Sequence, residues 1–136
     1  MKKLLIASLM SIFLMVSTVW AITWHTANQI TVAWDAVTTV TAPDILKYGV
    51  YTKMLPGDAT VFLGEQDGLS AVITFEIEGK YIIGVTSVRY VDVGTPEEKR
   101  LESEINWSDE NGENTPDPFG SSYYITPGPP KNLRKN

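Results

Sequence analysis

Residues 81–88 read Tyr-Ile-Ile-Gly-Val-Thr-Ser-Val, and this stretch decides the fold. Large apolar residues alternate here with small or polar ones, which is the pattern of a half-buried strand in a two-sheet sandwich. The stretch follows Glu78-Gly79-Lys80, a corner that contains glycine. A tyrosine directly after a corner can place its ring in the core while its hydroxyl bonds nearby backbone. We therefore expect Tyr81 to close such a corner at the start of the penultimate strand.

Other short strands surround this one, and turn residues separate them. Ile30, Val32 and Trp34 alternate with polar or small residues, so they share one face of a strand, and Trp34 is expected in the core. The remaining expected strands are 45–53, 60–63, 71–78 and 102–108, with 22–29 as an edge segment. In the strand 71–78, we expect Ile73, Phe75 and Ile77 to point inward. Such spacing predicts an all-β sandwich of about seven antiparallel strands.

Length and composition limit the alternatives. A chain of 136 residues, 43% hydrophobic and 20% charged, is long enough for one domain with one core and is too apolar for wholesale disorder. It holds 11 basic and 16 acidic residues, and without Lys2 and Lys3 the basic count falls to nine. Such an acidic body repels phosphate backbones, so we expect no nucleic-acid partner. The absence of cysteine from the sequence excludes disulfides, thiolate metal sites and a cysteine nucleophile.

Residues 1–21 read as a secretory signal peptide. Lys2 and Lys3 form a basic start, an apolar block follows, and Val19-Trp20-Ala21 offers small residues for cleavage. The alternative is an uncleaved membrane anchor, for which the apolar stretch is at the short limit of length. We expect no other membrane contact. The sequence thus predicts a secreted, periplasmic or cell-surface protein.

The strands in this order resemble a fibronectin type III domain. The match runs from a Trp-bearing second strand at 30–34, through Tyr48-Gly-Val-Tyr51, to the strand 81–88 and an acidic, Ser-containing last strand at 102–108. The resemblance implies an immunoglobulin-like β-sandwich over residues 22–110. Residues 111–136, rich in Pro and Gly, are expected to form an extended segment after it. A fold of this kind does not by itself imply a task.

Residues that carry catalytic or metal chemistry do not form a recognisable group. His25 is the only histidine and lies on the edge segment, where nothing predicts the rigid support that a catalytic imidazole needs. The carboxylate pairs Glu76/Glu78 and Glu102/Glu104 alternate with inward hydrophobes, which predicts a solvated face. The acidic segment 109–114 has the composition of a calcium loop but not its spacing. We therefore expect no catalytic site, no cofactor and no metal.

Exposed aromatics and the charged loop 91–101 make the strongest candidate for a binding surface, because loops at the end of a sandwich are free to vary. Outward aromatics anchor a protein partner or stack on sugars when they cluster. The candidate binding residues are Tyr51, Phe62, Tyr90, Thr95, Glu97 and Arg100, and the expected structural residues are Trp34, Tyr81, Val85 and Trp107. The sequence predicts a non-enzymatic module that binds a protein or a cell surface. The alternatives are a carbohydrate-binding module and a structural subunit of an extracellular assembly, in which the edge segment 22–29 or the tail 115–136 would pair with a neighbour's open sheet edge.

Overall fold

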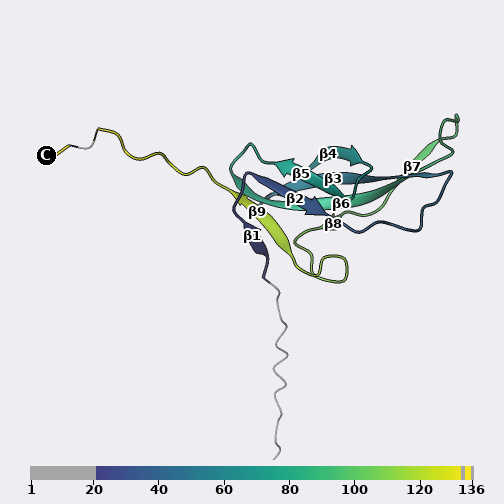
Figure 1. Cartoon of the computed structure of the whole chain (residues 1–136), viewed down its shortest axis with the longest axis horizontal. Coiled ribbons are helices and arrows are strands. Elements are labelled where there is room, and N and C mark those ends of the chain that lie inside the picture. Colours follow the sequence, from purple (N-terminus) through teal and green to yellow (C-terminus); the bar gives the residue numbers. More distant parts are fainter. Residues whose placement is uncertain (1–20, 133, 136) are drawn as a thin grey trace, which may run out of the picture.

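A computed structural model describes residues 21–132, 134 and 135 as strands and loops (Figure 1). The strands are β1 (Thr23–His25), β2 (Gln29–Ala33), β3 (Ile45–Leu55), β4 (Thr60–Gln66), β5 (Ser70–Thr74), β6 (Gly79–Val91), β7 (Lys99–Glu102), β8 (Asn106–Trp107) and β9 (Phe119–Tyr123). In this part of the chain no helix has the length and hydropathy to span a bilayer. Apart from Ala21, the predicted signal peptide lies outside the described residues.

The strands form one large sheet and one small sheet. The large sheet has the order β1-β9-β6-β3-β4, and β7 and β8 also pair with β6, while β2 and β5 form the small sheet. Every pairing is antiparallel except that of β1 with β9, which is parallel and joins Trp24 to Gly120. The expectation of a purely antiparallel sandwich is wrong at this edge, because residues 23–25 pair in parallel with a strand far along the sequence.

The two sheets pack face to face around one apolar core. Val32 and Ile73 of the small sheet meet Val50 and Ile83 of the large sheet, and Phe75 completes the buried cluster. Each of these side chains is at most 5% exposed. Trp34, Tyr81, Phe119 and Tyr123 pack around it while remaining partly exposed. The all-β class and the inward face of β2 are thus confirmed.

The corner before β6 has the hydrogen bond that the sequence predicts. The Tyr81 ring stacks on Phe75 with 4.4 Å between centroids, and its hydroxyl donates to the Ile77 carbonyl at 2.6 Å. The Ile77 side chain, however, is 67% exposed and does not point inward as expected. The strand β5 ends at Thr74, so the alternation that buries Ile73 stops before the corner.

The last strand is divided along one edge of β6. The segments β9, β8 and β7 pair in turn with the beginning, middle and end of β6, whereas β3 pairs along its whole other edge. The single strand expected at 102–108 is therefore wrong, and the expected loop 91–101 shortens to 92–98. Lys99 and Arg100 are predicted as loop residues because they are charged, but charged side chains also suit a solvent-facing strand.

The large sheet continues past residue 110, where the sequence predicts that the sandwich ends. The strand β9 lies within the segment expected to be merely extended, and it joins β1 to β6. This strand is hard to predict from the sequence, because Pro116, Pro118 and the glycines near the strand are typical of loops. Beyond Tyr123 the described residues leave the sandwich as an extended tail (Figure 1).

Candidate interaction surfaces

Four of the six candidate binding residues lie together on the large sheet. Tyr51 of β3 pairs with Phe62 of β4, and Tyr90 of β6 pairs with Arg100 of β7. Paired residues share a face, and this face is turned away from the small sheet. We define the outer surface as Tyr51, Phe62, Glu65, Tyr90, Arg100 and Glu102.

Arg100 connects two carboxylates on this surface. Its Nε donates to Glu65 Oε1 at 2.8 Å, and its Nη1 donates to Glu102 Oε2 at 2.7 Å. The Tyr90 hydroxyl donates to Glu65 Oε2 at 2.8 Å, and the Tyr51 hydroxyl donates to Glu102. The network therefore joins β3, β4, β6 and β7 through side chains, which holds the aromatic rings in fixed positions.

The network also changes the proton affinities of its members. Arg100 donates to Glu102 and lowers the pKa of that carboxyl to about 2. Burial by itself raises the pKa of Glu65, but hydrogen bonds from Tyr90 and Arg100 outweigh burial and lower it overall. The carboxylates in turn raise the pKa of the Tyr51 and Tyr90 hydroxyls, which donate to them. At neutral pH the network consists of two carboxylates, one guanidinium and two neutral phenols.

An exposed apolar strand borders the network. Val61, Phe62 and Leu63 are 54%, 51% and 48% exposed on β4, which is the last strand at one side of the large sheet. Val50 pairs with Gly64 and Tyr51 with Phe62, so Leu63 is the additional residue of a β-bulge. Gly64 has a φ of 137°, a conformation that favours glycine. No described strand pairs with the outer side of β4, so this edge combines unpaired backbone with apolar side chains, as a docking edge does.

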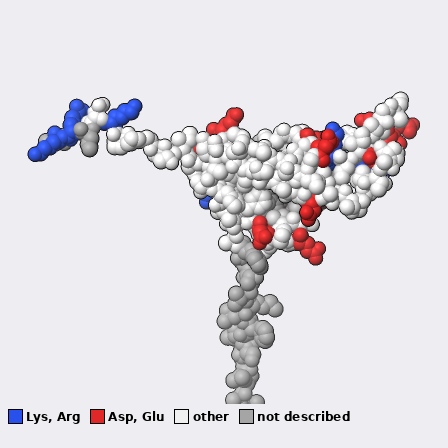
Figure 2. Space-filling model, viewed as in Figure 1, with Lys and Arg blue, Asp and Glu red and all other residues white. Residues whose placement is uncertain are grey.

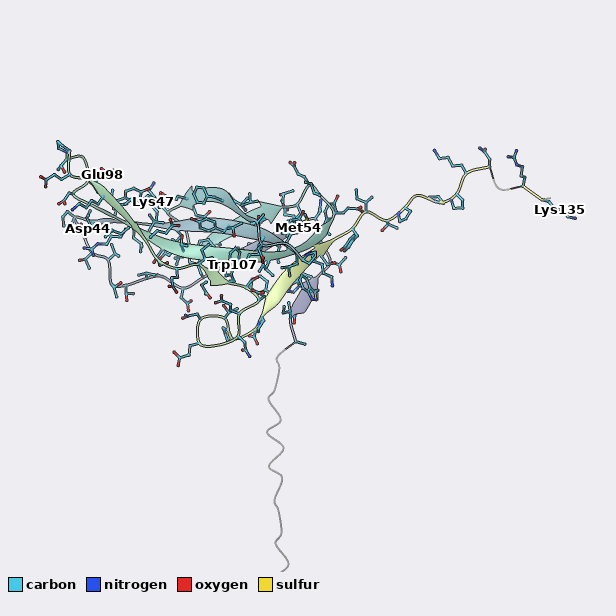
Figure 3. All side chains as sticks on the ribbon, turned by 180° about the vertical axis from the view of Figure 1, so that it is seen from behind. Asp44, Lys47, Met54, Glu98, Trp107 and Lys135 are labelled. Atoms are coloured by element: carbon cyan, nitrogen blue, oxygen red, sulfur yellow. The ribbon has the colours of Figure 1, made fainter. Side chains whose placement is uncertain are left out.

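Two Lys–Trp pairs continue the same face toward β1. Lys53 Nζ lies 4.4 Å from the Trp107 ring, and Lys80 Nζ lies 4.9 Å from the Trp24 ring. A Cβ on Gly84 would approach Trp107 Cε3 to 2.8 Å, so this glycine lets the indole lie flat on the sheet. Trp107, labelled in Figure 3, thus has a structural contact, but on the outer face and not between the sheets.

Thr95 and Glu97 lie apart from the outer surface, in the loop 92–98. The Thr95 hydroxyl donates to the Asp92 carbonyl at 2.7 Å, and Glu98 accepts from the Gly94 N–H at 2.8 Å. These bonds stabilise the loop itself. Figure 3 places Glu98 at the end of the sandwich, opposite the end from which the tail departs. The structure therefore separates the six candidates into four on the sheet and two on the loop.

A cleft of about 810 Å³ lies between β2 and the segment 103–119. Trp34 and Val85, both expected to be structural, line it, and the Trp34 ring packs 5.5 Å from the Tyr48 ring. Trp34 Nε1 is buried and has no hydrogen-bond partner among the described residues. Four carboxylate residues also line the cleft, namely Asp35, Glu104, Glu113 and Asp117. A smaller cleft of about 620 Å³ continues along β2 to His25.

The remaining motifs have local contacts. His25 is exposed and lies edge-on to Phe119, with 6.3 Å between centroids. In the acidic turn 109–114, the Gly112 N–H donates to the Thr115 carbonyl at 3.3 Å. Across the residues that the structure describes, no three His, Asp or Glu side chains are grouped to hold a metal ion.

Sequence reasoning missed Glu65, Trp24 and Lys53, and it assigned Glu102 to an unremarkable solvated face. Each contacts a residue from another strand, so its role depends on strand order and register. Of these residues, only Lys53 has a signal in the sequence, because it is two positions from Tyr51 on β3 and therefore lies on the same face. No protein-family model, curated protein or solved structure matches the chain.

Proposed function

We propose that this chain is an exported, non-enzymatic binding module of fibronectin type III type, which holds another protein at its outer surface. The observation that carries the proposal is the exposed apolar run of β4 beside the Glu65–Arg100–Glu102 network. Interfaces are enriched in aromatic residues and arginine, and fixed side chains lose less entropy on binding. Phe62 is the natural anchor, because it is half exposed and packs against a Tyr51 ring that Glu102 holds in place.

The aromatic geometry favours a protein over a sugar as the ligand. Tyr51 and Phe62 have centroids 5.1 Å apart but are tilted by 47°, so they do not form a flat platform. The network also engages the Tyr51 hydroxyl and both carboxylates, which a sugar would otherwise bind. A carbohydrate-binding module is the second candidate, and the two Lys–Trp pairs on the same face are what supports it.

The test is crosslinking in the native host, followed by capture of the tagged chain. Phe62→Ser removes the apolar anchor, and Val72→Ser is the matched control because Val72 is 61% exposed on the small sheet. We expect a specific protein to be captured by the parent and the control but lost with Phe62→Ser. Equal capture by all three chains would contradict the proposal.

A glycan array separates the two candidates. A specific sugar hit that Trp107→Ala abolishes and Phe62→Ser leaves intact would move the function to the carbohydrate alternative. Circular dichroism of each variant shows whether the sheets remain folded, so that a lost signal is assigned to the surface.

A further inference from the structure

The strand β2 has one unpaired edge whose free backbone groups can be identified. Trp34 N–H donates to the Leu69 carbonyl, and Phe75 N–H donates to the Asn28 carbonyl. In an antiparallel pair the residues that face the partner alternate, so Asn28, Ile30, Val32 and Trp34 direct their backbone groups to β5. Gln29, Thr31 and Ala33 therefore direct their N–H and C=O groups to the other side. Among the described residues no strand pairs there, because the small sheet consists of β2 and β5 alone.

The free edge opens onto the two clefts already described. Both contain residues of β2, and Phe119 of β9 lines both of them, so together they form a trench along the whole strand. The buried Trp34 Nε1, which has no partner in the part of the chain that the structure describes, is at this trench. A buried N–H without a partner is uncommon in a folded protein and points to an acceptor that is supplied from elsewhere.

The tail of this same chain has the properties of such a strand. Tyr124 and Ile125 are 58% and 62% exposed, and the backbone from Tyr124 to Pro130 is in no helix or strand. Proline lacks the N–H that a ladder needs, and Pro127 and Pro129 both fall on odd positions. The even positions Tyr124, Thr126 and Gly128 all retain their N–H groups. A strand that pairs through its even residues thus loses no hydrogen bond to proline.

Charge favours the same encounter between two copies. All 16 acidic residues lie between Asp35 and Asp117, and residues 21–130 carry only six basic ones, which gives that part a formal charge of −10. Lys131, Arg134 and Lys135 give the tail three positive charges. Figure 2 shows the basic residues at the far end of the tail and the acidic residues spread over the sandwich. The stretch from Pro127 to Pro130 favours an extended conformation, which carries those charges away from their own sandwich.

We propose that residues 124–129 of a second copy add to the free edge of β2 as an antiparallel strand. Thr126 then lies opposite Thr31, with Tyr124 opposite Ala33 and Gly128 opposite Gln29. Side chains of such pairs share a face, so Tyr124 and Thr126 point to solvent as Thr31 does. Ile125, Pro127 and Pro129 point into the trench, beside the buried face of β2. The basic residues leave the trench beyond Gln29, on the side of the corner that carries Glu76 and Glu78. The Glu78 carboxylate accepts from the Ile125 N–H of its own chain.

This assembly is independent of the outer surface, since it uses the opposite sheet. Because the chain contains no cysteine, engineered cysteines report the register directly. We would mix purified Thr31→Cys with purified Thr126→Cys under mild oxidation and measure the mass of the product. Hydrogen-bonded antiparallel pairs lie about 5.5 Å apart at Cα, which is within the range of a disulfide. Ile125→Cys is the matched control, because its side chain would point to the other face.

We expect a product of twice the chain mass from Thr31→Cys with Thr126→Cys, and less with the Ile125→Cys control. Thr31→Pro should lower the self-association constant by about fivefold or more, because it removes an edge N–H and leaves the bonds to β5 in place. Thr31→Val should not. Three results would overturn the proposal: monomers at every concentration in sedimentation, equal crosslinking of the control, or a Thr31→Cys/Thr126→Cys double variant that links only within one chain.

Discussion

At the scale of single residues, Tyr81 and Gly84 show how β6 makes packing contacts on both of its faces. Tyr81 faces the small sheet, where its ring stacks on Phe75. Gly84 faces outward and leaves room for Trp107. The sequence predicted that the Tyr81 ring enters the core and that its hydroxyl bonds nearby backbone, but not that the ring stacks on Phe75. It did not predict the contact between Trp107 and Gly84, because a glycine in a sequence does not indicate which side chain covers it.

Replacing Tyr81 with Phe tests the corner. The ring and its stacking remain, but the hydroxyl that donates to the Ile77 carbonyl is lost, so the free energy of unfolding should fall by about 0.5–1.5 kcal/mol. Denaturant unfolding monitored by fluorescence measures the change. Tyr124→Phe is the control, since Tyr124 is 58% exposed and should leave the midpoint unchanged. An unchanged midpoint for Tyr81→Phe would remove the energetic role of the corner.

Replacing Gly84 with Ala tests the packing on the outer face. The new Cβ would lie closer than van der Waals contact to Ile105 Cγ2 and, at 2.8 Å, to Trp107 Cε3. Such overpacking costs about 1–3 kcal/mol of unfolding free energy. Gly68→Ala is the matched control, because no atom lies within 4 Å of the Cβ it would add. If both variants unfold at the same denaturant concentration, the indole of Trp107 does not need a glycine beneath it.

At the scale of elements, prediction succeeded where one strand carries its own pattern. The strands β2, β3 and β6 have alternating faces and were predicted close to their observed positions. The segments β7 to β9 are short and polar or flanked by proline, and they become strands only because the edge of β6 accepts them. The outer surface depends on the same pairings, so the sequence yielded its aromatic residues but not the carboxylates that hold them.

The Arg100 network should make stability depend on acid. Glu102 has its pKa lowered to about 2 in the folded chain, against an ordinary value near 4.5. Its ionised form therefore stabilises the fold above about pH 4.5, and this contribution is lost as the pH falls toward 2. Glu102→Gln should flatten part of that dependence in unfolding curves measured from pH 6 to pH 2, assuming reversible unfolding. Glu104→Gln is the control, since its carboxylate has no ion pair among the described residues.

At the scale of the whole molecule, β9 decides how much of the chain is needed to fold. It lies between β1 and β6, so a chain that ends at residue 110 loses the connection of β1 to the sheet as well as Phe119 and Tyr123 from the core. We expect this truncation to unfold without a cooperative transition. A chain that ends at residue 126 should unfold cooperatively, and calorimetry of the two distinguishes them. Cooperative unfolding of the shorter chain would restore the boundary that the sequence predicts.

Because β7, β8 and β9 each pair with a different part of β6, we expect three different opening free energies along one strand. The Phe119 N–H donates to the Ser108 carbonyl at 2.7 Å, which links β9 to the end of β8. The strand β3 pairs along the whole opposite edge of β6, so we expect it to hold β6 in the sheet during brief local openings. Amide hydrogen exchange follows local opening, so amides of β6 that face β9, β8 and β7 should exchange with three different rates. The exchange rates of successive β6 amides would then measure the free energy with which each segment of the divided edge is attached.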